Sequence, residues 1–100
     1  MDFEWDEAKR QANILKHGID FVDATWAFSG RFIETEDRRR DYSERRYRVV
    51  GRLGDAVIQV AYTWRGERRR IISARRAGRN DRRAYYASLT QTGSQNEEPN

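Results

Sequence analysis

The stretch RRRIISARRA, residues 68–77, alternates arginine with apolar side chains at the point where a strand should end and a final helix should begin. A period of two indicates a β-strand, because successive strand residues point to opposite faces of a sheet. The basic run continues beyond Gly78 as far as Arg83. A row of guanidinium groups on a rigid element requires an anionic partner.

Simple alternation divides the arginines of this strand between two faces. Arg70 and Arg76 fall on one face with Arg68 and Ile72, and the opposite face carries Arg69, Ile71, Ser73 and Arg75. Both faces cannot bind the same ligand. We therefore expect one set to bind phosphate and the other to pair with acids or to lie at the rim of the sheet.

Alternation and turn residues predict a run of antiparallel strands around this stretch. Ala56–Trp64 is the most apolar segment and should be the central strand. Gly54-Asp55 and Arg65-Gly66 are typical of tight turns between neighbouring antiparallel strands. The predicted strands are Phe32–Glu36, Arg46–Leu53, Ala56–Trp64 and Arg68–Arg76, and Phe3–Trp5 is either a short edge strand or an apolar lid.

Two helices are predicted before the strands. Asp6 is a good N-cap and Gly18 a good terminator for a helix at Glu7–His17, whose Ala8, Ala12 and Leu15 form one apolar stripe. Asp20 can cap a second helix that ends near Ser29-Gly30.

The order of elements predicts an α+β domain with two N-terminal helices, an antiparallel sheet of about four strands and a C-terminal helix from Arg79 to about Leu89. Residues 1–89 should form this single domain, and residues 90–100 a polar, disordered tail with nothing to bury. The first two helices should cover one sheet face. The other face is then partly open and is the expected working surface.

The charge of the chain is large and unevenly spread. Its basic residues are 18 Arg and 2 Lys, and arginine offers a planar fork that matches phosphate. Residues 1–30 carry a net charge of −3, whereas residues 65–83 carry +7. This asymmetry favours nucleic acid over a membrane surface as the partner, because no amphipathic basic helix accompanies it. A solvated basic face that only aids solubility is the alternative interpretation.

Several classes of protein are excluded by what the sequence lacks. Without cysteine there are no disulfides, thiolate zinc sites or cysteine nucleophiles. One histidine cannot build a typical zinc site, and the N-terminal acids lack EF-hand spacing, so we expect no metal and no cofactor. No signal-peptide pattern or transmembrane run is present, and we therefore expect no membrane contact and a cytoplasmic location.

Two blocks of the sequence and a few residues between them form a recognisable pattern. They are Phe3-Glu4-Trp5-Asp6 with Lys9, Asn13, Lys16-His17-Gly18-Ile19 and Phe21, then Glu44 and Arg46, then Arg70–Ala77 with Tyr85-Tyr86. In this order and at this separation they resemble the BrnT family, over residues 2–87 or so. The Arg-rich loop at 36–43 and the segment after Ser88 depart from the family pattern.

The resemblance implies a RelE-like fold and the toxin half of a type II toxin–antitoxin pair. It implies a metal-independent endoribonuclease that cleaves mRNA and so suppresses translation. It also implies a cognate BrnA-type antitoxin as the neutralising partner, with operator DNA reached only indirectly through that antitoxin.

Cleavage of RNA without a metal needs a base for the 2′-hydroxyl, cations for the charge that grows on phosphorus, and an acid for the leaving 5′-oxygen. Arginine suits the second role but is a poor proton carrier. Histidine is the residue type best suited to carry a proton near neutral pH, yet His17 also occupies the last turn of a helix, where a histidine can bond free carbonyls. The residues leave both interpretations of His17 open.

The other candidate residues also have two interpretations each. Glu44 is a general base or an ion-pair partner of an arginine. Tyr85 stacks on a base, donates a proton or belongs to the core. We favour Arg46, Arg70 and Arg76 as the functional cluster, with Arg48 joining from the neighbouring strand. The candidate residues are His17, Glu44, Arg46, Arg70, Arg76 and Tyr85 for catalysis, and Lys16, Arg48, Arg75 and Arg79 for RNA binding.

Two other functions are compatible with the same residues. A non-catalytic nucleic-acid-binding module needs the arginine surface but no proton carrier. A protein-interaction subunit would use the basic face to bind an acidic segment of a partner. Cleavage of RNA in the presence of a metal chelator would distinguish the ribonuclease hypothesis from these two alternatives.

Overall fold

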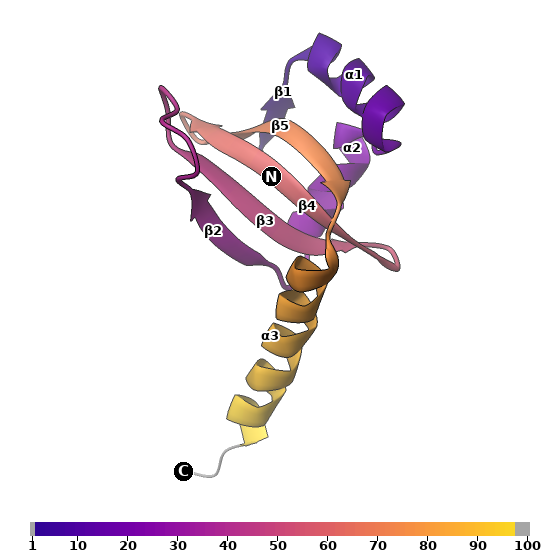
Figure 1. Ribbon diagram of the computed structural model, residues 1–100, viewed down its shortest axis with the longest axis vertical. Coiled ribbons are helices and arrows are strands. Elements are labelled where there is room, and N and C mark those ends of the chain that lie inside the picture. The colour runs from indigo at the N-terminus through magenta and orange to yellow at the C-terminus, as the bar shows by residue number, and fades with distance from the viewer. Residues whose placement is uncertain (1, 98–100) are drawn as a thin grey trace.

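The computed structural model describes residues 2–97, with side chains through Thr90. A five-stranded sheet has the order β1-β5-β4-β3-β2, and residues 2–97 also form three α-helices and one 3-10 helix (Figure 1). The elements are β1 (Phe3–Trp5), α1 (Glu7–His17), α2 (Phe21–Ala24), η1 (Thr25–Phe28), β2 (Ile33–Asp37), β3 (Arg46–Leu53), β4 (Ala56–Arg65), β5 (Arg68–Arg76) and α3 (Arg79–Glu97). The α+β class is the predicted one.

The sheet differs from the prediction in number and direction of strands. Its strands number five, not about four, because Phe3–Trp5 is an edge strand and not a lid. This strand runs parallel to β5, with Phe3 beside Arg69 and Trp5 beside Ile71, so the sheet is mixed and not antiparallel throughout. Phe3 and Trp5 of β1 pack against the larger hydrophobic core, which explains why so short a strand stays at the edge of the sheet.

Helix α1 begins and ends where its capping residues predict. Asp6 accepts hydrogen bonds from the backbone N–H groups of Ala8 and Lys9, and Gly18 closes the helix with a left-handed φ of 72°. The apolar stripe of Ala8, Ala12 and Leu15, however, faces solvent, and Leu15 is 89% exposed. The face that contacts the domain is the opposite one, where Asn13 is buried.

The hydrogen bonds of Asn13 explain why α1 packs against the domain through a polar side chain. Its amide nitrogen donates to the carbonyl oxygens of Ala74 (2.8 Å) and Ile19 (2.9 Å), and its amide oxygen accepts from the Ala74 N–H (3.1 Å). The side chain therefore acts as a strand partner at the edge of β5, beyond the end of β1. A hydrogen-bonded edge contact, not apolar burial, fixes the position of α1.

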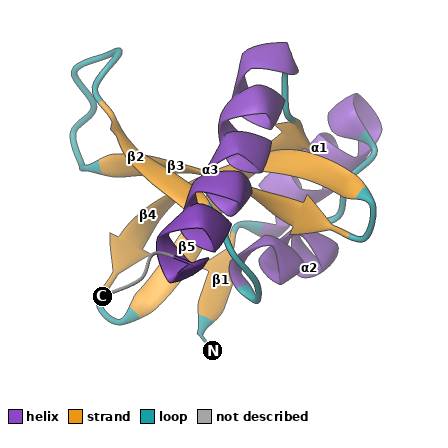
Figure 2. Ribbon diagram, turned by 90° about the horizontal axis from the view of Figure 1, so that it is seen from below, coloured by secondary structure: helices purple, strands orange, loops and turns teal. Residues whose placement is uncertain are grey.

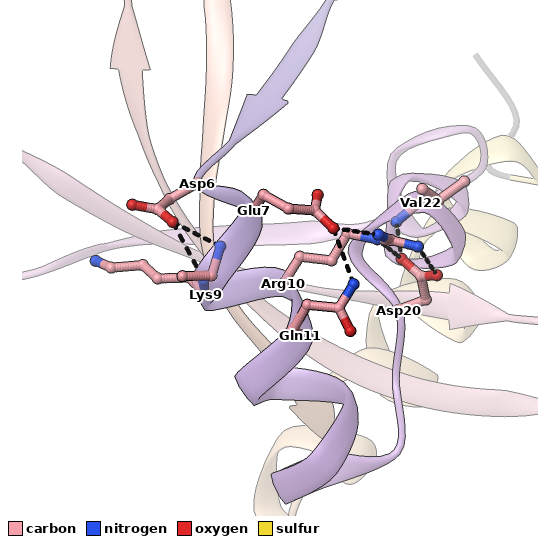
Figure 3. Close-up of polar contacts among 8 residues, drawn as sticks. Asp6, Glu7, Lys9, Arg10, Gln11, Asp20 and Val22 are labelled. Atoms are coloured by element: carbon pink, nitrogen blue, oxygen red, sulfur yellow. Dashed lines mark hydrogen bonds and ion pairs between the residues drawn. The ribbon is translucent and has the colours of Figure 1, made fainter.

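A cluster of charged side chains joins α1 to α2 at their N-termini (Figure 3). The Arg10 guanidinium donates two hydrogen bonds of 2.8 Å to Asp20 and one of 2.7 Å to Glu7. Asp20 also accepts from the Val22 N–H as the N-cap of α2. The Arg10 bonds and the Val22 bond hold the pKa of Asp20 below its ordinary value.

The main core lies between the sheet and the α2–η1 segment. The predicted second helix is α-helical only for its first turn and continues as the 3-10 helix η1. Phe21, Ala24 and Phe28 are buried against Ile58, Val60 and Tyr62 of β4. Burial raises the pKa of Tyr62 to about 12, and a hydrogen bond to Glu34 adds to the rise. The hydroxyl of Tyr62 therefore stays protonated and donates to Glu34.

Helix α3 projects from one end of the sheet, as Figures 1 and 2 show. It continues to Glu97, eight residues beyond the predicted end at Leu89, so the expected tail is helical over most of its length. Helical backbone hydrogen bonds lie within the segment, so the helix continues without apolar side chains to bury. Residues 98–100 of that tail lie outside the described residues, and the domain boundary at residue 89 stays a prediction.

Candidate nucleic-acid interface

The sheet face opposite α2 and η1 carries most of the strand arginines. Because Ile58, Val60 and Tyr62 point into the main core, the alternate residues of β4, Gln59, Ala61 and Thr63, point to this other face. The strand register places the residues of β3 and β5 that pair with them on the same face. We call this surface the open face. Its arginines are Arg46, Arg48, Arg52, Arg65, Arg68, Arg70 and Arg75, and those near its middle are Arg46, Arg48, Arg70 and Arg75.

A β-bulge in β5 sets which arginines belong to the open face. Ala61 pairs with Ser73 and Tyr62 with Ile71, so Ile72 has no partner in the register. The extra residue reverses the alternation of β5 beyond that point. Arg70 and Arg75 consequently share the open face, whereas simple alternation separates them.

The predicted grouping of Arg70 with Arg76 is therefore wrong. Arg76 pairs with Ile58 and points to the side of the helices, where it lines a hollow of about 250 Å³ with Gly18 and Asp23. Arg69 lies on the same side, with its guanidinium carbon 4.7–5.2 Å from the ring centroids of Phe28, Tyr62 and Trp64. Arg69 is thus engaged with aromatic rings.

Arg46 and Arg48 present partly unsatisfied guanidinium groups on the β3 side of the open face. Each has a buried Nε atom with no hydrogen-bond partner among the described residues. The Arg46 Nε lies 3.4 Å from a Glu44 oxygen, a charged contact without hydrogen-bond geometry, and its guanidinium covers the Tyr42 ring at 4.2 Å. Both side chains are half-buried, so the outer nitrogens of their guanidinium groups are the donors that an anion on this face would meet.

Arg70 and Arg75 lie on the β5 side of the open face and have different partners. Arg70 donates to Glu4 of β1 at 2.7 Å, and both side chains are about 30% exposed. Arg75 is exposed and donates from its Nε to the Gln59 amide oxygen at 3.2 Å. Its terminal nitrogens have no hydrogen bond to any side chain that the structure describes.

Two carboxylates border the open face at the Arg46 end. Glu44 lies between Arg46 (3.4 Å) and Arg65 (3.5 Å), the position of an ion-pair partner of arginine. Asp37 pairs in register with Arg46 and is 5% exposed. Two hydrogen bonds from the Arg39 side chain hold the pKa of Asp37 far below its ordinary value, and the Arg39 N–H and the Tyr42 hydroxyl add to this effect.

The structure places His17 in a hollow between α1 and the bulge of β5. The hollow has a volume of about 270 Å³ and is lined by Lys9, Ala12, Asn13, Lys16, His17, Ile72 and Ser73. Ser73 also belongs to the open face, since it pairs with Ala61. Lys9, Lys16 and His17 of α1 therefore adjoin the edge of the open face next to β5.

Two other predicted site residues belong to α3. Tyr85 is 2% exposed, and its hydroxyl donates to the Arg31 carbonyl at 3.1 Å, so it is a core residue without access to a ligand. It packs with Val50, Val57 and Ala77 in a second, smaller core. Arg79 is exposed in the first turn of α3, and Tyr86, not Tyr85, presents its ring to solvent.

Sequence reasoning missed the polar residues that organise the open face. Gln59 is 7% exposed and bridges Arg75 to Asp81 of α3, and Ser73 joins the open face to the hollow beside α1. The only signal for Gln59 is a lone amide in the apolar run of β4. No pattern in the sequence could place Asp81 beside it.

Neither a metal centre, among the side chains described through Thr90, nor a membrane span, among the helices of residues 2–97, is found. No group of three or more histidine or acidic side chains there could hold a metal ion. In the same range, each helix is too short or too polar to cross a bilayer.

Comparisons with known proteins show the family of this chain. The family described as "Ribonuclease toxin, BrnT, of type II toxin-antitoxin system" matches residues 5–81. The crystal structure of the ribonuclease toxin BrnT from Brucella abortus is similar, with a TM-score of 0.59 and 32% identity over 79% of this chain and 99% of that one. No curated protein matches the sequence. The chain therefore belongs to the BrnT family of ribonuclease toxins of type II toxin–antitoxin systems.

Proposed function

We propose that this protein is a metal-independent endoribonuclease that cleaves mRNA bound on the open face. The observation that carries the proposal is the convergence of Arg46, Arg48, Arg70 and Arg75 from two strands onto one face, where two Nε donors have no partner. Phosphate is the ligand that arginine forks match best. The RelE-like character of the fold belongs to the same proposal.

The chemistry begins with the 2′-oxygen of the RNA, which attacks the adjacent phosphorus and loses its proton to a base. A 2′,3′-cyclic phosphate forms, the bond from phosphorus to the 5′-oxygen breaks, and that oxygen takes up a proton. The negative charge that grows on the non-bridging oxygens is stabilised by the arginines of the open face. These steps need no metal ion.

His17 is the best candidate for the proton carrier. Histidine gains and loses protons near neutral pH, and this one adjoins the open face through the hollow that Ser73 lines. Glu44 has two arginine contacts that favour the role of an ion-pair partner, and Tyr85 is buried. Lys16 and Lys9, which line the hollow with His17, would attract the phosphate chain toward it.

We also propose that the partner is a BrnA-type antitoxin, which would neutralise the toxin and connect it indirectly to operator DNA. The support is membership of a family of type II toxins. Induction of this protein alone in a bacterial host should stop growth, and co-expression of the neighbouring small open reading frame should restore it. Normal growth with confirmed soluble expression would contradict the toxin assignment.

A cleavage assay separates catalysis from binding. Purified protein should cut RNA in the presence of EDTA and leave cyclic phosphate ends. The His17→Ala variant should lose cleavage but keep RNA affinity, whereas Arg48→Ala should lose affinity. If the wild-type protein binds RNA without cutting it, the non-catalytic binding module is the correct function.

A further inference from the structure

Gln59 occupies a position on the open face that links two oppositely charged residues. Its amide oxygen accepts a hydrogen bond from the Arg75 Nε (3.2 Å), and its amide nitrogen donates to an Asp81 carboxylate oxygen (2.8 Å). The three residues come from β4, β5 and the first turn of α3. Gln59 is 7% exposed, and this chain of hydrogen bonds holds its amide in place.

The chemistry of the three groups fixes the orientation of the amide. A guanidinium can only donate and a carboxylate can only accept, so the group between them must offer one acceptor and one donor. A primary amide meets this requirement in one orientation, oxygen toward Arg75 and nitrogen toward Asp81. A glutamate in its place would repel Asp81, and a lysine would repel Arg75.

The amide also keeps the two charges apart. A direct pair of Arg75 with Asp81 would occupy the terminal nitrogens of the guanidinium and neutralise it. With Gln59 between them, Arg75 uses only its Nε, and its remaining donors stay available at the surface. The bond at Nε restricts the rotation of the guanidinium, so those donors keep one direction.

We propose that Gln59 is a positioning residue, which Asp81 anchors and which orients the Arg75 guanidinium toward a phosphate of the bound RNA. This inference rests on the proposed function, since it assumes that RNA lies on the open face. Gln59 itself does not contact the RNA in this arrangement. It acts through Arg75 alone.

A double-mutant cycle tests the inference with a short single-stranded RNA whose 2′-oxygens are methylated, so that it binds without being cut. Gln59→Leu should weaken binding about tenfold, the size expected if Arg75 loses its hydrogen bond to an RNA phosphate. In the Arg75→Ala background the same substitution should change affinity less than twofold. Equal losses in both backgrounds would show that Gln59 acts through the general structure, and would overturn the inference.

A second pair of variants avoids changing the buried residue. Asp81→Asn and Asp81→Ala remove the same negative charge, but only asparagine keeps an oxygen that can accept from Gln59. Asp81→Asn should bind RNA at least as tightly as the wild type, and Asp81→Ala several-fold more weakly than Asp81→Asn. Equal affinities for the two variants would also overturn the inference.

The wild-type protein and Arg75→Ala distinguish failure of the inference from failure of the proposed function. If the wild type does not bind the RNA, both are wrong. If it binds and Arg75→Ala binds equally well, RNA recognition stands but Arg75 and Gln59 have no part in it.

Discussion

Arg70 and Arg75 lie on the same face of β5, although they are five positions apart and a regular strand would place them on opposite faces. The bulge at Ile72 is responsible, because it adds one residue to β5 that has no partner on β4. A surface that would otherwise hold one arginine of this pair thus holds both. Bulges that redirect side chains in this way are common next to functional sites.

The bulge predicts which arginines of β5 affect RNA binding. Arg70→Ala should weaken binding of a short single-stranded RNA and lower the slope of log affinity against log salt by about 0.7, the loss of one phosphate contact. Arg76→Ala is the matched control, because Arg76 faces the helices and should leave that slope unchanged. A salt slope that falls for Arg76→Ala but not for Arg70→Ala would contradict the assignment of faces.

Replacement of Asn13 should destabilise the protein more than its helix position suggests. Asn13→Ala removes three hydrogen bonds and leaves buried groups of Ala74 and Ile19 without partners. The free energy of unfolding should fall by about 2–4 kcal/mol in urea denaturation. Gln11→Ala, on the exposed side of the same helix, should change it by less than about 0.5 kcal/mol. Similar values for the two variants would refute the role of Asn13 as a strand partner.

Gly51 should not tolerate a larger residue, because of its contact with η1. A Cβ atom at this position would clash with the carbonyl oxygen of Ala27. Gly51→Ala should therefore cost about 1–3 kcal/mol of stability as β3 and η1 move apart. Gly30→Ala is the control, since no atom lies within 4 Å of its added Cβ. Thermal melts of both variants would measure the difference, and an unchanged melting temperature for Gly51→Ala would exclude the close approach.

Asp37 should make the stability of the fold depend on acid pH. Its pKa in the folded protein lies below the ordinary value of 3.8, so the unfolded chain takes up the proton first as the pH falls. The stabilising contribution is present above about pH 4 and is lost as the pH falls through the folded pKa. The Asp37→Asn variant should therefore be less stable than the wild type at pH 7, and the gap should narrow toward about pH 2. Urea denaturation across this range measures the gap. Asp41→Asn, in the neighbouring exposed loop, is the control for the loss of one negative charge.

The local signals in the sequence predict most of the elements. The bounds Glu7–His17, Arg46–Leu53 and Arg68–Arg76 are confirmed, because caps, alternation and turn residues act within a few positions of one another. The resemblance to the BrnT family is confirmed by the family match over residues 5–81. The end of α3 was predicted too early, since a polar helix needs no apolar pattern to continue.

Periodicity alone misplaced several side chains. The stripe of Ala8, Ala12 and Leu15 suits burial, yet the bonds of Asn13 to Ala74 turn the opposite face of α1 inward. A contact between distant segments therefore outweighs a local pattern. Tyr85 fills the second core together with Leu89, which is the alternative that their shared helix face indicates.

The sequence by itself determined the strands, the helices, the excess of arginine and the family to which the chain belongs. Only the tertiary structure decided which arginines share a face, that Asn13 completes the edge of β5, and that Gln59 separates Arg75 from Asp81. The physical reason is the separation along the chain of the residues that interact. Caps and periods involve neighbours in the chain, whereas the bulge and these hydrogen bonds join residues that become neighbours only when the sheet, α1 and α3 assemble.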